Sequence, residues 1–235
     1  METCRPEQPG FMQGVRDCIP TVLGYVSIGF AAGIVGNSAG LSLLEIGLLS
    51  ALVYAGASQF IICAMLMTMS PASAIIATAF LVNLRHLLMS ATLAPHFTSY
   101  SLATNIGIGA LLTDESFGVA TNRIAQGAPL SARWMNGLNL TAYSVWIVSC
   151  VAGGWLGSWI SDPEAAGLDF ALTAMFAALL VLQLAAQPKS RLWRYIALIG
   201  YMIVIMYILS AVFSSSVAVL LSTLIVATIG AVTDK

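Results

Sequence analysis

Charged residues are scarce in this sequence. Only 8% of its 235 residues are Asp, Glu, Lys or Arg, whereas about 25% is usual for soluble domains. So few charged side chains cannot cover the surface of a water-soluble body of this size. The net charge of -1 offers no basic face to phosphates, and no aromatic residues alternate with Lys or Arg as they would in a nucleic-acid platform. The composition therefore excludes an ordinary soluble domain and argues against a nucleic-acid partner.

Residues that commonly hold metals are also few. The two histidines, His86 and His96, have no carboxylate or thiol at ligand spacing. The cysteines form no pair at metal-ligand or redox spacing, so we expect small buried side chains. They are Cys4, Cys18, Cys63 and Cys150. Because no nucleophile and base pair is recognisable either, we expect no metal, no cofactor and no enzyme activity.

Apolar residues make up 59% of the chain, and they form runs that approach the roughly 20 residues needed to cross a bilayer. The pattern predicts an all-α bundle of about eight transmembrane helices, forming a single integral membrane domain over residues 1–235 with a polar segment at 1–17. The expected helices run from about Ile19 to Val35, Leu44 to Met67, Ala74 to Leu93, Leu102 to Ala120, Met135 to Trp159, Leu168 to Leu184, Tyr195 to Phe213 and Val217 to Val232.

The basic residues predict the orientation, because Lys and Arg are retained on the cytoplasmic side. With both termini cytoplasmic, eight of the nine basic residues fall inside. They are Arg5, Arg16, Arg123, Arg133, Lys189, Arg191, Arg194 and Lys235. The weakly charged Ser70-Pro71 connection leaves open whether the helices around it are continuous or re-entrant. A faint echo of glycines about 120 residues apart leaves open whether the bundle contains a parallel or an inverted repeat.

The ninth basic residue, Arg85, lies in the middle of an apolar run beside Asn83 and His86. An Arg at the bilayer centre costs at least about 3 kcal/mol, so we expect it to face the bundle interior and to find a partner. Asp114 and Glu115 are the only acids away from the ends of an expected span. Such a cluster can load and release a proton. Two alternatives stay open: a structural ion pair that locks two helices together, and a position of Arg85 and His86 near the membrane interface.

Small and polar residues alternate in the first two expected helices. The glycines are Gly24, Gly29, Gly33 and Gly56, and the polar side chains are Tyr54, Ser58 and Gln59. Small residues let helix backbones approach closely, so one interpretation is helix packing alone. The other interpretation is a broken helix, in which glycine-weakened turns expose backbone groups to a substrate carboxylate and ammonium.

Several strings, in order along nearly the whole chain, resemble the AzlC or YgaZ family. They are Gly14 through Pro20, Gly24-Tyr25, Gly29, Gly33, Gly40-Leu41-Ser42 with Glu45, Tyr54-Ala55-Gly56-Ala57-Ser58-Gln59-Phe60, Asn83-Leu84-Arg85-His86-Leu87-Leu88-Met89-Ser90, Thr113-Asp114-Glu115-Ser116-Phe117 and Gly167-Leu168-Asp169-Phe170. The resemblance implies the large subunit of a branched-chain amino acid exporter in the bacterial inner membrane. It also implies a small multi-span membrane partner of the AzlD or YgaH kind and secondary transport driven by the proton gradient.

Candidate roles follow from the residues and the resemblance together. We expect a substrate-binding set of Tyr54, Ser58, Gln59, Asn83 and Arg85, and a proton-coupling set of His86, Asp114 and Glu115. Two other functions remain open: a passive channel for small neutral solutes, which needs no ionisable interior residues, and a structural membrane subunit without transport of its own.

Overall fold

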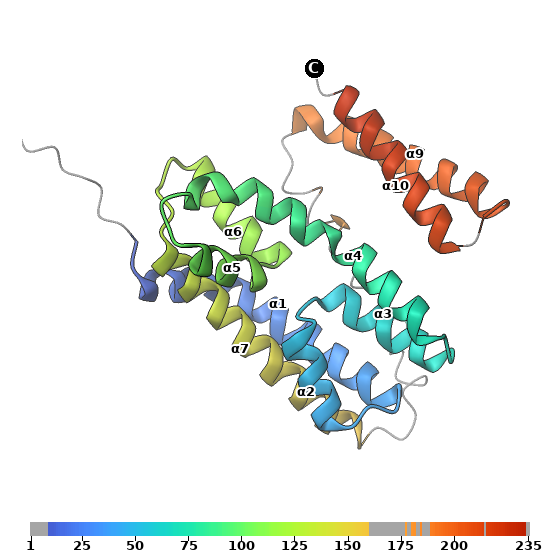
Figure 1. Ribbon diagram of the computed structural model, residues 1–235, viewed down its shortest axis with the longest axis horizontal. Helices are drawn as coiled ribbons and strands as arrows, with labels where there is room; N and C mark the ends of the chain where they lie inside the picture. The colour runs from blue at the N-terminus through green and yellow to red at the C-terminus, as the bar shows by residue number, and fades with distance from the viewer. Residues whose placement is uncertain are drawn as a thin grey trace, which may run out of the picture. The chain divides into compact units, whose positions relative to one another are not determined.

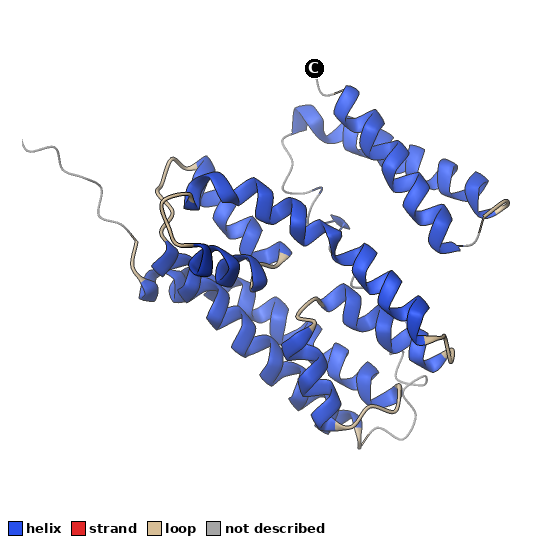
Figure 2. Cartoon of the chain, in the orientation of Figure 1, coloured by secondary structure: helices blue, strands red, loops and turns tan. Residues whose placement is uncertain are grey.

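The computed structural model of the chain describes residues 9–159, 177, 180, 181, 184, 189–213 and 215–233. Throughout this described part the chain forms helices joined by short loops, without a strand (Figure 2). Four helices are long and apolar enough to cross a membrane: Phe11–Ser38, Ala72–Phe97, Ala132–Gly157 and Arg191–Ser210. The expected all-helical membrane fold is confirmed. The chain divides into two compact units, Met1–Leu172 and Thr173–Lys235.

Two long helices, α1 (Phe11–Ser38) and α7 (Ala132–Gly157), form the spine of the first unit. They run parallel, because Gly14 faces Trp134 near the start of both helices and Gly33 faces Cys150 near their ends. A Cβ atom on either glycine would overlap a backbone carbonyl oxygen of α7. Glycine therefore lets the two backbones touch, as small residues do in membrane bundles.

A first pair of half-length helices, α2 (Leu43–Leu52) and α3 (Gly56–Met67), follows α1. Helix α2 starts at the end of the unit where α7 finishes, since the side chain of Leu43 lies beside Gly154. It ends half-way along α7, where the Tyr143 hydroxyl donates to the Ala51 carbonyl oxygen. Ten residues of helix span about 15 Å, half of a hydrocarbon core about 30 Å thick. The expectation of one continuous helix over residues 44–67 is therefore wrong.

The next long helix, α4 (Ala72–Leu93), continues into the 3-10 turn η1 (Ala94–Phe97). It is followed by a second half-length pair, α5 (Leu102–Ala110) and α6 (Asp114–Ala125). Along this pair Ile108 meets Asn139 of α7, Thr113 meets Tyr25 of α1, and Arg123 reaches Asp17 near the start of α1. Helix α5 thus runs inward from the end where α1 and α7 begin, and α6 returns to it. The expected continuous helix over residues 102–120 is also wrong.

The first unit repeats one order of elements in inverted direction (Figure 1). Helix α1 is followed by the α2/α3 hairpin, which enters from the end where α1 finishes. Helix α4 runs the other way and is followed by the α5/α6 hairpin, which enters from the opposite end. Inverted repeats with broken helices are typical of secondary transporters. Because the hairpins do not cross, α4 runs opposite to the direction that eight simple crossings predicted.

The ends of the first unit differ in charge. Arg16 of α1, Arg123 of α6 and Arg133 of α7 lie at the end where α1 and α7 begin, which we call the basic end. Glu45 caps the start of α2 at the other end, where its carboxylate accepts from the Ser42 backbone N–H. The retention of Lys and Arg in the cytoplasm assigns the basic end to the cytoplasmic side.

The second unit contains α9 (Lys189–Ser210) and α10 (Ser215–Val232). These helices pack together where the Leu198 side chain lies 3.4 Å from the Cβ position of Gly230. The expected helices over residues 195–213 and 217–232 are confirmed. The expected helix over residues 168–184 lies outside the described residues, except for single positions.

Candidate functional site

The tip of the α2/α3 hairpin is strained and uncapped. Tyr54 adopts a left-handed conformation with φ of 40°, which is unfavourable for a residue with a Cβ. Ala55 is extended, and no side chain caps the first turn of α3, which contains no acidic residue. The Cβ position of Gly56 lies 2.9 Å from the ring of Trp146, so α7 packs directly against the tip. The first N–H groups of α3 have no partner within the helix.

Polar side chains beside this tip are buried and only partly paired. The Ser58 hydroxyl donates to Asn83 Oδ1 of α4 at 2.7 Å. The Trp146 indole N–H donates to Gln59 Oε1 at 3.0 Å, while Gln59 Nε2 has no partner among the described residues. The Tyr54 hydroxyl is likewise unpaired within that part of the chain, although Tyr54 is only 5% exposed. Buried hydrogen-bond donors without partners are rare in high-resolution protein structures.

The tip of the α5/α6 hairpin is capped by its own residues. Thr113 Oγ1 accepts from the Ser116 backbone N–H, and Ser116 Oγ accepts in return from the Thr113 N–H at 2.9 Å. This reciprocal arrangement is a capping box. Asp114 and Glu115 occupy the first turn of α6, where carboxylates are stabilised by the helix dipole. The positive end of α6 is therefore neutralised from within.

An ion pair joins the second tip to α4. Arg85 Nη1 lies 2.9 Å from Asp114 Oδ2, with the two side chains 32% and 27% exposed. Arg85 Nε is buried and has no hydrogen-bond partner in the described part of the chain. His86, the next residue, is half-buried and makes no hydrogen bond to a described residue. The arginine that the sequence placed in an apolar run is thus beside an acid, as expected.

Glu115 has different surroundings from its neighbour Asp114. The Tyr25 hydroxyl of α1 donates to Glu115 Oε2 at 2.9 Å and also contacts Thr113 Oγ1. Tyr25 is 4% exposed, and its ring packs edge-on against Trp146 with centroids 5.5 Å apart. The two adjacent carboxylates therefore face a cation and a buried hydroxyl, respectively.

The structure brings most of the expected site residues to the two tips. Tyr54, Ser58, Gln59, Asn83, Arg85, Asp114 and Glu115 all lie there. The glycines of α1 are elsewhere, in a continuous helix: Gly29 and Gly33 pack on α7, and nothing described lies within 4 Å of the Cβ position of Gly24. Sequence reasoning missed Tyr143 and Trp146 of α7, which contact the α2/α3 tip. No local sequence pattern marks them.

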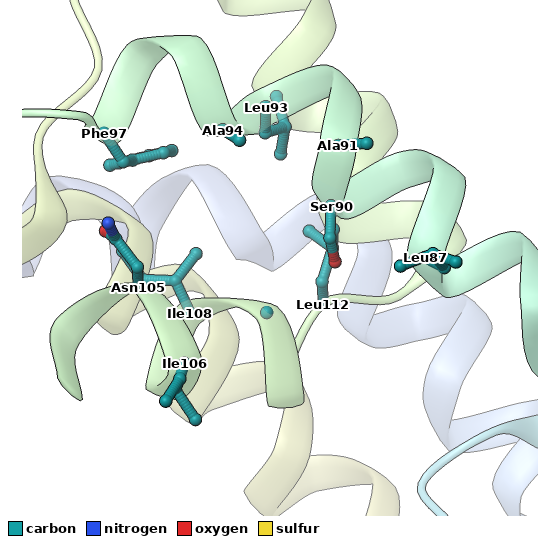
Figure 3. A pocket seen from close by; sticks show the side chains of 11 residues that line it. Leu87, Ser90, Ala91, Leu93, Ala94, Phe97, Asn105, Ile106, Ile108 and Leu112 are labelled. Atoms are coloured by element: carbon teal, nitrogen blue, oxygen red, sulfur yellow. The ribbon is translucent and has the colours of Figure 1, made fainter. Parts of the chain in front are cut away.

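An apolar pocket of about 330 Å³ lies between the α4–η1 segment and α5 (Figure 3). Its lining residues are Leu87, Ser90, Ala91, Leu93, Ala94, Phe97, Asn105, Ile106, Ile108, Gly109 and Leu112. Helices α4 and α5 therefore contribute an apolar wall, in addition to the ion pair between α4 and α6.

Comparison with known proteins identifies the family. The protein-family model described as "AzlC protein" matches residues 20–160, which include both hairpins. The chain belongs to the AzlC family. Its relatives in that comparison include the "Inner membrane protein YgaZ" of Escherichia coli, 32% identical over 209 residues that cover 85% of this chain and 84% of the relative.

Two further relatives also match this AzlC-family chain. The "Branched-chain amino acid transport protein AzlC" of Bacillus subtilis is 26% identical over 77% of this chain and 69% of the relative. An "Uncharacterized membrane protein" of Archaeoglobus fulgidus is 33% identical over 73% of this chain and 74% of the relative. No solved structure matches. The matched residues contain the half-helix hairpins, so the candidate site lies in the part shared with the family.

Proposed function

We propose that this chain is the large subunit of a carrier that exports branched-chain amino acids across the bacterial inner membrane in exchange for protons. The name of the Bacillus subtilis relative supports the substrate class. The observation that carries the proposal is that two half-helix tips, one with unpaired donors and one with carboxylates, are linked through the contact of Tyr25 with Trp146. Broken helices of this kind bind substrate and coupling ions in other carriers.

The α2/α3 tip suits the carboxylate of an amino acid. The start of α3 presents unpaired N–H groups and the positive end of a helix dipole, without an acidic residue of its own. The Tyr54 hydroxyl and Gln59 Nε2 are buried donors that lack partners within the described chain. Ser58 and Asn83 hold α3 against α4. A carboxylate bound here would satisfy groups that are otherwise unpaired.

The α5/α6 tip suits positive charge. Asp114 and Glu115 provide two carboxylates, one of which can receive the transported proton. Arg85 compensates Asp114, and His86 stands beside this pair. A carboxylate in a low-dielectric site changes its proton affinity with each change of its neighbours, which is what coupling requires. His86, Asp114 and Glu115 are therefore proposed as the proton-coupling set.

The apolar pocket between α4, η1 and α5 suits a branched aliphatic side chain. It is walled by α4, η1 and α5, and its volume of about 330 Å³ falls at the lower end of ligand pockets. We assign the partner subunit, a small multi-span membrane protein of the AzlD or YgaH type, from the family resemblance. Its test is co-purification with this chain from membranes in which both are expressed.

The transport proposal is tested in inverted membrane vesicles that contain this chain and its small partner. Export corresponds to uptake of labelled leucine into these vesicles. We expect saturable uptake that an acidic lumen stimulates and a protonophore abolishes. Equal rates with and without the pH gradient would remove proton coupling. An absence of uptake with both subunits present would remove the substrate assignment.

A further inference from the structure

A cleft of about 600 Å³ leads inward from the basic end, between α1, α6 and the first turn of α7. Its walls carry Arg16, Asp17 and Thr21 of α1 and Asn122 and Gln126 at the end of α6, together with apolar residues such as Val119. The cleft opens on the side that the basic residues predict to be cytoplasmic.

The mouth of the cleft is built around one aspartate. Asp17 Oδ2 lies 3.2 Å from Arg123 Nη1 and accepts from the Trp134 indole N–H at 2.8 Å. The Arg123 guanidinium stands 5.0 Å from the centre of the Trp134 ring, a cation–π arrangement. Arg16 is exposed and makes no hydrogen bond or ion pair to a described residue. These contacts hold the ends of α1, α6 and α7 together around the mouth of the cleft.

The deep end of the cleft is Glu115. From Gln126 to Glu115 the cleft follows 11 residues of α6, which correspond to about 16 Å of helix, or half of the hydrocarbon thickness. Behind Glu115 the path is closed by Tyr25, which donates to the Glu115 carboxylate and is itself buried. Glu115 thus stands at the boundary between cytoplasmic water and the buried tips.

Asp114 does not line this cleft; it turns to α4, where it pairs with Arg85. Glu115 has no ion pair to a described residue. The groups that face it are the hydroxyls of Tyr25 and Thr113, with Tyr54 of the other tip nearby. The charged residues of the cleft lie toward its mouth, and Arg133, the one charged residue of α7, lies in the first turn of that helix. A cation therefore holds Asp114, whereas Glu115 lines the cleft.

We propose that Glu115 is the carboxylate that releases the transported proton to the cytoplasm, through the cleft between α1 and α6. Within the proposed proton-coupling set, Asp114 pairs with Arg85 and acts as a positioning residue for the α5/α6 tip. In the release step, the O–H bond of protonated Glu115 breaks and the proton passes to water in the cleft. The Glu115 carboxylate then accepts a hydrogen bond from the Tyr25 hydroxyl. This assignment deepens the proposed function and rests on it.

The cleft is tested by thiol labelling in a chain carrying C4S, since Cys18, Cys63 and Cys150 are buried. Val119 lines the cleft one turn from Glu115, and Thr121 on the same helix does not. We expect a membrane-impermeant thiol reagent to label V119C in inverted vesicles only, and T121C in neither orientation. Failure to label V119C, or equal labelling from both sides, would overturn the cleft as a cytoplasmic route.

The proton role is tested with E115Q and D114N in two assays. Counterflow exchanges labelled for unlabelled leucine without net proton movement, whereas gradient-driven uptake requires it. We expect E115Q to keep counterflow within twofold of the wild-type rate, to lose at least tenfold in gradient-driven uptake and to give a flat pH profile. D114N should lose both activities, and D114E should restore both. Loss of both by E115Q, or retention of both, would overturn the assignment.

The wild-type chain separates this inference from the proposed function. If the wild type with its small partner shows no leucine counterflow, the transport proposal fails. The labelling of V119C would still decide whether the cleft reaches the level of Glu115 from the cytoplasmic side, because that measurement needs no substrate.

Discussion

The two hairpins share a shape but differ in how their tips are completed. The α5/α6 tip caps itself through Thr113 and Ser116 and carries its own acids against the helix dipole. The α2/α3 tip has no cap and no acid, and it leaves the donors of Tyr54 and Gln59 unpaired in the described chain. One tip therefore pairs the start of its helix with its own residues, and the other leaves buried donors unpaired. An inverted repeat has produced two ends of opposite preference, which suits a zwitterion.

The supports of the two tips differ as well. Trp146 and Tyr143 of α7 hold the α2/α3 tip by ring contacts and by a hydrogen bond to Ala51. The α5/α6 tip is held by Arg85 of α4 through charge and by Tyr25 of α1 through a hydroxyl. In the proposed mechanism, a change in proton occupancy acts directly on the second set of supports, which the Tyr25–Trp146 ring contact joins to the first.

The largest expected effect comes from removing the charge that holds the α5/α6 tip. In R85A the Asp114 carboxylate is left unpaired at mid-depth. Breaking a fully buried pair costs about 3–5 kcal/mol of folding stability. Because these side chains are only 32% and 27% exposed, we expect R85A to lose about 2 kcal/mol of stability. We also expect it to lose more than tenfold in leucine counterflow. Thermal unfolding in detergent should show a matching loss of stability.

The control for R85A is the double variant R85M/D114L, in which both partners are apolar and of similar size. Because no charge is left unpaired, its thermal stability should lie closer to that of the wild type than that of R85A. Its gradient-driven uptake should still be lost. If R85A transports normally, the pair does not hold the second tip, and the contrast between the hairpins loses its electrostatic basis.

The next effect comes from giving the α2/α3 tip the acid that it lacks. Ala55 occupies the N-cap position of α3, where Asp and Asn both cap well. In A55D the carboxylate would occupy the position proposed for the substrate carboxylate, and we expect about tenfold weaker leucine binding, since each tenfold corresponds to about 1.4 kcal/mol. Binding is measured by the concentration dependence of counterflow.

A55N is the matched control, because asparagine has the same size and caps without charge. It should keep leucine binding within about twofold, while A55D loses it. Equal loss in both variants would point to crowding at the buried tip rather than to competition for an anion site. The comparison of the two tips would then rest on geometry alone.

How much of this site could be read from the sequence differs between the tips. Thr113-Asp114-Glu115-Ser116, a hydroxyl residue followed by two acids and a second hydroxyl, is typical of a helix start rather than of a helix middle. The apolar residues on either side nevertheless favoured one continuous span. The partner of Arg85 could be predicted, because no other acids lie away from the ends of an expected span.

The α2/α3 tip could not be predicted in the same way. No proline or capping residue marks residues 53–55, and Gly56 alone is a weak signal. The left-handed Tyr54 is supported by Tyr143 and Trp146, which lie about 90 residues later in the chain. Local propensity does not contain such contacts. For the same reason the re-entrant course of both hairpins, which reverses the direction expected for α4, follows only from the tertiary packing.

A smaller effect is expected in the apolar pocket at the side of the α5/α6 hairpin. Gly109 lines the pocket, and its Cβ position lies 3.5 Å from Ser90 Oγ. In G109L the added side chain should fill part of the pocket and reduce the preference for leucine over alanine about fivefold, since a few missing methylenes change binding by about 1–3 kcal/mol. G107L, on the same helix with open space around the glycine, should keep the wild-type preference. Competition against labelled leucine measures both, and an unchanged preference in G109L would remove the pocket from the site.

The smallest effect concerns the cap that distinguishes the two tips. T113V keeps the shape of Thr113 but removes the oxygen that accepts from the Ser116 N–H and contacts Tyr25. Losing an N-cap costs about 1 kcal/mol, which should lower the unfolding midpoint by about 3 °C for a chain of this size. In T121V the lost hydroxyl only bonds back to the Phe117 and Gly118 carbonyl oxygens of the same helix, and we expect no measurable change. If the two variants unfold at the same temperature, the α5/α6 tip does not depend on its cap. The missing cap of α3 would then not support an anion-binding site at the α2/α3 tip.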